Sequence, residues 1–358
     1  MQPGVFLKKN CMLRKDVEYT EYLQLEKILN AQTLESDKEN AHAHDEMLFI
    51  IIHQAYELWF KQIHFEVDSA LAILSKESVN DNSPELQSIV HRTGRIVTIL
   101  KVLVHQIDIL ETMTPLDFLE FRDFLRPASG FQSWQFKMLE AKLGLKFEHR
   151  HGKEYYTSML KPEYLQEVKK VESQKTLLEL IDIWLRRMPF FNDSELWKNY
   201  KPVYPQDTGY HIFWNDFLHI YENTLVEGEK HNKGLFEDIF LKGEKSEHTN
   251  LSGEAMRNAL FISLYRGYPL LQMPFQLMQN LLDIDEQMAT WRFRHINMVH
   301  RMIGSRVGTG GSSGKEYLQG ALSKHYIFKD FAILSSFLIQ SNKLPELGEE
   351  LKRRLGYH

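Results

Sequence analysis

Apolar residues recur at intervals of three and four positions along almost the whole of this 358-residue chain, and alternating apolar–polar runs are scarce. That spacing places apolar side chains on one face of an α-helix, so it constrains the fold more than any other feature. We therefore expect an all-α protein. The pattern predicts helices over 18–31, 45–75, 85–111, 115–126, 132–144, 162–187, 211–224, 253–265, 274–303, 315–323 and 327–340.

Two polar, turn-rich stretches, 75–85 and 240–254, interrupt the helical pattern, but strongly periodic sequence resumes directly after each. They are typical of loops rather than of linkers between domains. We expect a single large helical domain over residues 1–358, in which 132–250 forms a helical subregion.

Composition excludes several classes of protein. The net charge is only −5 and short basic clusters are followed by acidic stretches, so the basic surface of a nucleic-acid-binding protein is missing. No uncharged run approaches the ~20 residues of a membrane span. The single cysteine, Cys11, cannot form an internal disulfide or a cysteine-based metal site, which fits a reducing compartment. We expect a cytoplasmic protein with neither nucleic acid nor membrane as a partner.

The stretch from Gly304 to Gly314 holds five glycines and three serines in eleven residues. It does not match a phosphate-binding P-loop, because Thr309 stands where the first glycine is needed and Glu316 where Ser or Thr is needed. A dinucleotide fingerprint fails as well, since no strand-like run precedes it. Its backbone N–H groups, at the start of the next predicted helix, are suited to holding an anion.

The predicted helix 45–75 places Phe49, His53, Tyr56 and Phe60 on one face. Two interpretations of His53 remain: a core histidine that hydrogen-bonds a nearby carbonyl, or a polar group that faces an aromatic ligand pocket. On another face, Glu57 and its neighbour four residues later, Lys61, are expected to form a solvent-facing ion pair.

Two further segments carry candidate groups. His295 shares a helix face with Trp291, so it is either a metal or haem ligand or a structural residue. Arg122 follows Phe118 by one helical turn, where a guanidinium could bind a carboxylate bidentately or simply be solvated. The Ser129–Gly130 turn is typical of a helix boundary.

Taken together, the stretches "YTEYLQLEKIL", "HDEMLFIIIHQAYELWFKQ", "FRDFLRPASGFQSWQF", "WRFRH" and "GTGGSSG" resemble the tryptophan 2,3-dioxygenase family. The resemblance extends over nearly the whole chain and is weaker at 74–90 and 145–250. It implies a helical domain that encloses a b-type haem, ferrous in the active state. It also implies insertion of O₂ across the indole C2–C3 bond of L-tryptophan to give N-formyl-L-kynurenine, the first step of tryptophan degradation.

The resemblance further implies roles for individual residues. His295 corresponds to the axial ligand of the haem iron and His53 to the catalytic histidine on the opposite side. The remaining positions match the indole pocket (Phe49, Phe118), the partners of the substrate carboxylate (Arg122, Thr309), a serine near the haem (Ser129) and the part of an N-terminal segment, 1–30, that enters a neighbouring subunit's site in a homotetramer (Tyr19, Tyr22, Leu23).

Three alternatives remain open at this stage. A related haem oxygenase could act on a substituted tryptophan, or a haem sensor could keep the pocket without turnover. The third alternative is a helical interaction protein without haem. A complete substrate-binding set, with Arg122 beside an aromatic wall, argues against a sensor.

Overall fold

The computed structural model describes residues 16–147, 150, 160–206, 209–242, 246–306, 308 and 325–356. Within these ranges the chain forms helices, turns and loops without a strand, so the all-α prediction is confirmed. The longer helices are α4 (Glu46–Leu74), α5 (Pro84–Leu110), α7 (Trp134–Leu143), α9 (Pro162–Glu172), α10 (Leu177–Arg186), α11 (Ile212–Glu222), α13 (Gly253–Leu264) and α14 (Pro269–Ile303). The shorter helices are α1 (Tyr19–Leu23), α2 (Leu25–Leu29), α3 (Glu35–Lys38), α6 (Pro115–Phe121), α12 (His231–Phe236), α16 (Lys329–Ile333) and α17 (Glu349–Leu355). The 3-10 turns are η1 (Gly130–Gln132), η3 (Ser194–Trp197), η4 (Glu227–Glu229), η6 (Leu334–Phe337) and η7 (Ser341–Lys343), and η5 (Glu237–Leu241) is a π-helix.

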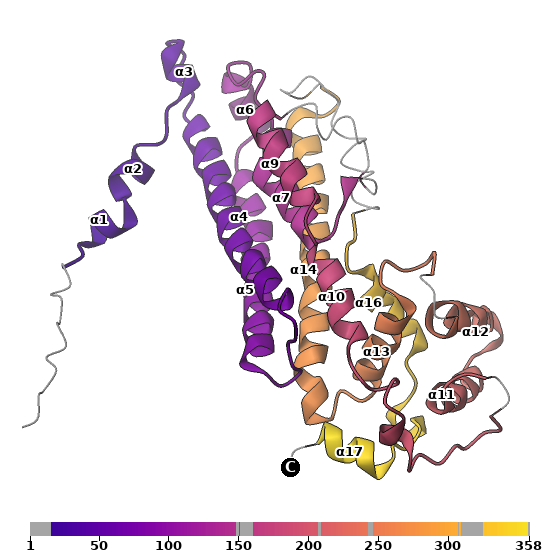
Figure 1. The fold of residues 1–358 in the computed structure, drawn as a ribbon. Coiled ribbons are helices and arrows are strands. Elements are labelled where there is room, and N and C mark those ends of the chain that lie inside the picture. Colours follow the sequence, from indigo (N-terminus) through magenta and orange to yellow (C-terminus); the bar gives the residue numbers. More distant parts are fainter. Residues whose placement is uncertain are drawn as a thin grey trace, which may run out of the picture.

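The long helices α4, α5 and α14 lie side by side and form the main axis of the molecule (Figure 1). Polar bonds fix their alignment inside an apolar seam. The Tyr56 hydroxyl of α4 donates to the Leu103 carbonyl of α5 at 2.9 Å, and Asn280 of α14 donates to the Val90 carbonyl of α5 at 2.9 Å. A buried polar group must be paired to avoid a large desolvation cost, so these bonds favour one register of the three helices.

Helix boundaries follow capping signals where the sequence supplies them. Ser83 accepts a hydrogen bond from the Leu86 N–H at 3.2 Å and starts α5. Thr114 and Asp117 form a reciprocal capping box that starts α6. The predicted helices 45–75, 85–111, 132–144, 211–224 and 253–265 are confirmed to within a few residues.

Other predicted boundaries were wrong. The helix predicted over 162–187 is two helices, because Thr176 and Glu179 form a capping box that begins α10. The helix predicted over 18–31 divides at Gln24, whose φ of 53° lies in the left-handed region. The last long helix begins at Pro269 rather than at 274 and tolerates Pro274 inside it.

The helix predicted over 115–126 ends early, at Phe121. Nearer the C-terminus, the range 327–340 contains only the short elements α16 and η6 instead of one helix. The helices α3, α12 and α17 were not predicted, and the helix predicted over 315–323 lies outside the described residues.

The hydrophobic core continues into a region of aromatic rings around α11, α12 and η5, at the end of the molecule away from α4 and α5 (Figure 1). Its rings pack tightly, as at Phe236 and Phe240, whose centroids are 4.8 Å apart. A buried carboxylate, Asp216, anchors the preceding loop by accepting from the Tyr200 hydroxyl at 2.8 Å and the Val203 N–H at 2.8 Å. This region serves the fold rather than the site described below.

The N-terminal arm, α1 and α2, projects away from the rest of the chain (Figure 1). Neither helix buries any residue. Short isolated helices are unstable in water, so an arm of this kind needs a surface to pack against.

Candidate active site

Helix α4 carries Phe49 and His53 one turn apart, with their ring centroids 4.1 Å from each other. The His53 Nδ1 lies 2.7 Å from the Phe49 carbonyl oxygen. A carbonyl only accepts, so Nδ1 carries the proton and Nε2 keeps the lone pair in the neutral ring. Burial lowers the pKa of His53, and this effect outweighs the opposing influence of the Phe49 carbonyl and the Glu57 charge. His53 is therefore neutral at pH 7, with Nε2 available to accept a hydrogen bond.

Three phenylalanines form an aromatic wall beside His53. The Phe49 centroid is 5.8 Å from that of Phe118 and 5.5 Å from that of Phe121. The rings of Phe118 and Phe121 meet at 90° with centroids 5.4 Å apart, which is a favourable edge-to-face arrangement. The wall therefore combines one side chain from α4 with two from α6, and suits a flat apolar ligand.

Arg122 follows the wall at the end of α6 and is only 3% exposed. Its guanidinium carbon lies 5.9 Å from the centroid of the Phe118 ring. Because so little of Arg122 is exposed, the solvated alternative is wrong. Arginine is rarely buried without an anionic or hydrogen-bonding partner. A buried guanidinium beside an aromatic wall can bind the carboxylate of an aromatic amino acid.

His295 approaches from α14, with its ring stacked on that of Trp291 at 5.0 Å and an interplanar angle of 6°. Burial, with a smaller contribution from the nearby His53, lowers the pKa of His295 to about 4, since two imidazolium charges would repel. Among the described residues, His295 Nδ1 is a buried nitrogen without a hydrogen-bond partner. The two histidines thus approach each other from opposite helices, and both are neutral.

The surroundings of His295 fit what a haem needs from the protein. No group of three or more His, Cys, Asp or Glu residues that could hold a metal ion occurs in the described part of the chain. A haem iron takes four nitrogens from its own ring and needs only one protein ligand. A neutral, half-buried imidazole with an unpartnered nitrogen is a suitable ligand of this kind.

The expected ion pair between Glu57 and Lys61 is not among those formed by the described residues. Glu57 Oε2 instead accepts from Gln135 Nε2 at 2.8 Å, and the same nitrogen donates to the Glu57 carbonyl oxygen at 3.0 Å. The contact ties α7 to α4 one turn after His53. A surface prediction based on one helix missed it because Gln135 comes from another helix.

Other predicted site residues are placed as follows. Ser129 caps η1: its hydroxyl accepts from the Phe131 N–H at 3.4 Å, and its own N–H donates to Gln132. Tyr19 and Tyr22 are 70% and 74% exposed on the projecting arm, and Leu23 is partly exposed. The structure of one chain does not bring these three to the aromatic wall. Thr309 lies outside the described residues.

Phe121 is the wall residue that the sequence analysis missed. It lies three positions after Phe118, and a helix brings residues three apart together as it does residues four apart, so the spacing could have found it.

Comparison with known proteins shows the family of the chain. A model of the tryptophan 2,3-dioxygenase family matches residues 8–338. The chain belongs to the tryptophan 2,3-dioxygenase family. The family predicted from the sequence blocks is confirmed.

Named relatives of the chain come from bacteria and eukaryotes. The tryptophan 2,3-dioxygenase of Bdellovibrio bacteriovorus is 41% identical over 360 residues, which cover 96% of this chain and 98% of that protein. Those of Dictyostelium discoideum and Mus musculus are 41% and 40% identical, over 96% and 92% of this chain and 89% and 84% of those proteins. None of the helices in the described ranges is long and apolar enough to cross a membrane.

Proposed function

We propose that this protein is an L-tryptophan 2,3-dioxygenase, which adds O₂ across the indole C2–C3 bond and releases N-formyl-L-kynurenine. Both oxygen atoms end in the product, so the reaction needs no external reductant. One observation supports the proposal most: two neutral histidines approach each other from α4 and α14 beside an aromatic wall that a buried arginine follows.

We propose that His295 would hold the iron of a b-type haem that is ferrous in the active state. When bound, ferrous haem supplies the iron at which O₂ is activated. The chain supplies a ligand that burial keeps neutral and that the parallel Trp291 ring keeps oriented. His295 would have to give up a proton before binding iron if it were not already neutral.

The substrate is held by its three chemical parts. The indole ring packs against Phe49 and Phe118, and its N–H donates to His53 Nε2, because Nδ1 is already committed to the Phe49 carbonyl. Arg122 binds the carboxylate, and we propose Thr309 as a second partner of the amino-acid end. The hydrogen bond from the indole N–H to His53 Nε2 orients the C2–C3 bond, and the aromatic wall keeps water away from the reacting atoms.

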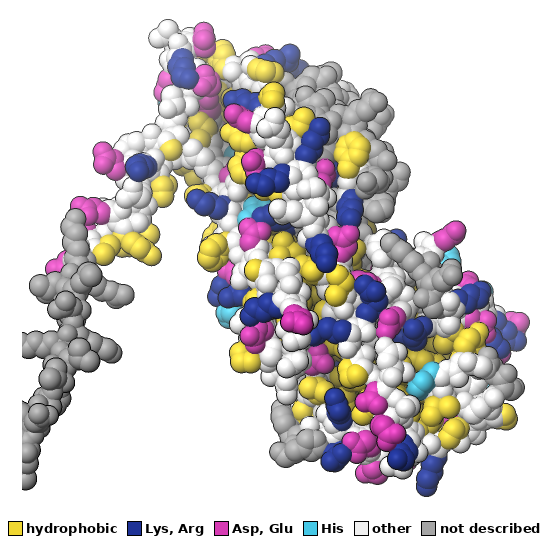
Figure 2. Space-filling view, viewed as in Figure 1, with side chains coloured by type: hydrophobic (Ala, Val, Ile, Leu, Met, Phe, Trp, Pro, Cys, Tyr) yellow, Lys and Arg dark blue, Asp and Glu magenta, His cyan; other side chains and the backbone are white. Residues whose placement is uncertain are grey.

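We propose that the functional unit is a cytoplasmic homotetramer in which residues 1–30 reach a neighbouring subunit. Apolar side chains are exposed along the arm (Figure 2), where Tyr19, Tyr22 and Leu29 are each at least 70% exposed. On α4, Phe65 is 72% exposed and Leu58 is 55% exposed. Apolar surface of this extent favours burial against other copies of the chain. Tyr19, Tyr22 and Leu23 would then complete the partner's site, with Ser129 near its own haem, and 132–250 stays a helical subregion of one domain.

One experiment tests this function. The purified protein is supplied with haem, and its Soret absorbance is recorded before and after addition of L-tryptophan. The mass of the product is then measured by mass spectrometry. We expect a haem spectrum, a substrate-dependent change and a product two oxygen atoms heavier than tryptophan. A product with one added oxygen would favour an enzyme that oxidises a substituted tryptophan. A haem spectrum without turnover would favour a sensor. The absence of a Soret band would refute haem chemistry.

A further inference from the structure

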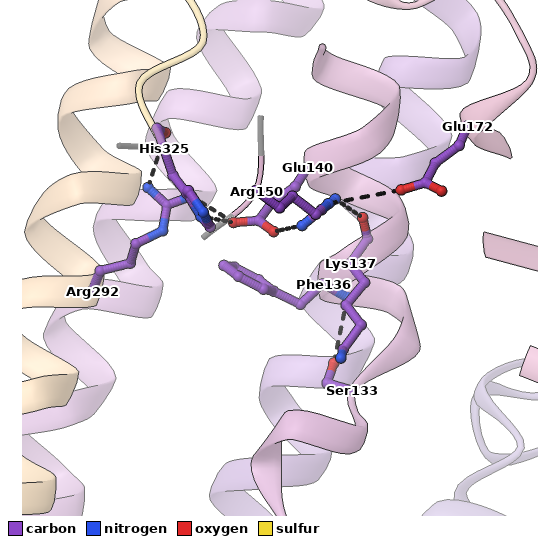
Figure 3. Close-up of polar contacts among 8 residues, drawn as sticks. All are labelled: Ser133, Phe136, Lys137, Glu140, Arg150, Glu172, Arg292 and His325. Atoms are coloured by element: carbon purple, nitrogen blue, oxygen red, sulfur yellow. Dashed lines mark hydrogen bonds and ion pairs between the residues drawn. The ribbon is translucent and has the colours of Figure 1, made fainter. Parts of the chain in front are cut away.

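A buried ion cluster connects α7 to α14 (Figure 3). At its centre is Glu140 of α7, which is 4% exposed. Its Oε1 accepts from Arg292 Nη2 at 2.7 Å, and its Oε2 accepts from Arg150 Nη1 at 2.5 Å. Each carboxylate oxygen therefore binds an arginine from a different segment of the chain.

Further contacts extend the cluster. Arg292 Nη1 donates to the His325 carbonyl at 3.3 Å, and Arg150 Nη2 donates to the Lys137 carbonyl at 3.1 Å. Burial alone would raise the pKa of Glu140, but Arg150, His325 and Arg292 lower it well below its usual value, so the carboxyl stays ionised. Removal of one member would leave an uncompensated buried charge on its partner, which strongly favours the intact arrangement.

The cluster lies beside the residues that orient His295. Phe136 precedes Glu140 by one turn of α7, and its ring centroid is 5.1 Å from that of Trp291 on α14. Trp291 is next to Arg292 in the chain and stacks on His295. One face of α7 thus holds α14 at two adjacent side chains, through an aromatic contact at Trp291 and an ionic one at Arg292.

This geometry explains why an ionic contact should matter for the orientation of an imidazole. The ring contact between Phe136 and Trp291 allows sliding, because offset aromatic pairs have broad energy minima. The bond between Glu140 and Arg292 is short and charge-assisted, so it fixes the rotation and axial position of this part of α14. His295 is one turn further along the same helix and moves with it.

We propose that Glu140 is a positioning residue for His295: by holding Arg292 it sets the turn of α14 that presents the imidazole. The inference rests on the proposed role of His295 as a haem ligand. Glu140 contacts neither substrate nor cofactor in this account and acts only through Arg292 and its neighbour Trp291. Partners beyond the ligand itself commonly change metal affinity by about 10- to 100-fold, and an indirect one belongs at the lower end.

The alternative is that Glu140 only stabilises the fold. Asp216 provides a matched control, because it is also a fully buried carboxylate with several donors but lies in the aromatic region around α11. Both Glu140→Gln and Asp216→Asn should lower the melting temperature. Only the first should change the haem site.

The test uses the haem-loaded full chain. The rate of haem transfer to excess apomyoglobin and the iron–histidine stretching frequency of the ferrous protein are measured for the parent, Glu140→Gln and Asp216→Asn. We expect Glu140→Gln to lose haem about tenfold faster, with a shifted frequency, and Asp216→Asn to match the parent in both. In the haem-free protein, amide exchange over the turn from Trp291 to His295 should be faster in Glu140→Gln alone.

A parental rate and frequency in Glu140→Gln would overturn the inference, as would equal shifts in Asp216→Asn. If Glu140→Gln does not fold, Glu140→Asp keeps the charge and withdraws it by one methylene group. A shifted frequency in that variant supports the inference and a parental one refutes it. If the parent protein binds no haem, the proposed function is refuted instead. If the parent binds haem, His295→Ala abolishes that binding and Glu140→Gln leaves it unaffected, then only the positioning role is rejected.

Discussion

Replacing Arg122 with alanine should weaken L-tryptophan binding and leave haem in place. A hydrogen bond to a charged group contributes ~1.5–3 kcal/mol, and each ~1.4 kcal/mol is a factor of ten in affinity, so the expected loss is roughly ten- to a hundredfold. The burial of Arg122 favours the upper end, because at 3% exposure water cannot readily take the place of the lost guanidinium. Its position beside the Phe118 ring means that some aromatic packing is lost as well.

The assay is a titration of the haem-loaded protein with L-tryptophan and, separately, with indole, which lacks the carboxylate. Arg126→Ala is the matched control, since Arg126 is 57% exposed, pairs with Asp123 at 3.2 Å and lies one turn further on. We expect Arg122→Ala to lose affinity for tryptophan only, and Arg126→Ala for neither ligand. Equal losses for both ligands would mean that Arg122 acts through folding. Unchanged tryptophan affinity would mean that another group binds the carboxylate.

Other variants test the two histidines and the glycine-rich stretch. His295→Ala should lose the Soret absorbance while His300→Ala, exposed on the same helix, keeps it, and stoichiometric haem in the first variant would refute the ligand assignment. His53→Ala should keep haem and lose about tenfold in rate, the worth of roughly one neutral hydrogen bond, whereas a haem-free His53→Ala protein would exchange the two roles. Thr309→Ala should reduce discrimination between L- and D-tryptophan in binding titrations, and unchanged discrimination would remove Thr309 from the site. In haem-free protein, the unfolded chain protonates His295 below pH 6.5 but the folded chain only near 4. The free energy of unfolding should therefore fall as pH decreases between these values, by about 3 kcal/mol more in the parent than in His295→Ala. If the free energy of unfolding had the same pH dependence in both proteins, the lowered pKa would be contradicted.

Much of the fold follows from local sequence signals. The helices α4 and α5 were predicted to within one residue at each end, because a long apolar period marks both and Ser83 caps the start of α5. The break between α9 and α10 also has a local signal, because Thr176 and Glu179 form a capping box. The apolar spacing continues across the break, so one continuous helix was predicted instead. The short helix α17 carries too few turns for its period to be distinguished from a loop.

The site was only partly accessible to the same reasoning. Spacing placed Phe118 and Arg122 one turn apart, but it could not decide between a solvated arginine and a buried one. That choice depends on how α6 packs in the folded chain, where Arg122 is only 3% exposed. The family resemblance assigned roles to His53 and His295, and the structure adds that burial makes both neutral.

The pairing of His53 with His295 shows why such a site is invisible within any single helix. Each imidazole lies on an aromatic face that, read alone, is typical of a core histidine. Only when α4 and α14 pack does each become part of the other's surroundings, and protonation of one then opposes protonation of the other. The same burial that would be unremarkable for a structural histidine therefore keeps both rings neutral, and in the proposed function one ring binds the haem iron while the other accepts a hydrogen bond from the substrate. Helix packing, rather than any local motif, creates that division of roles.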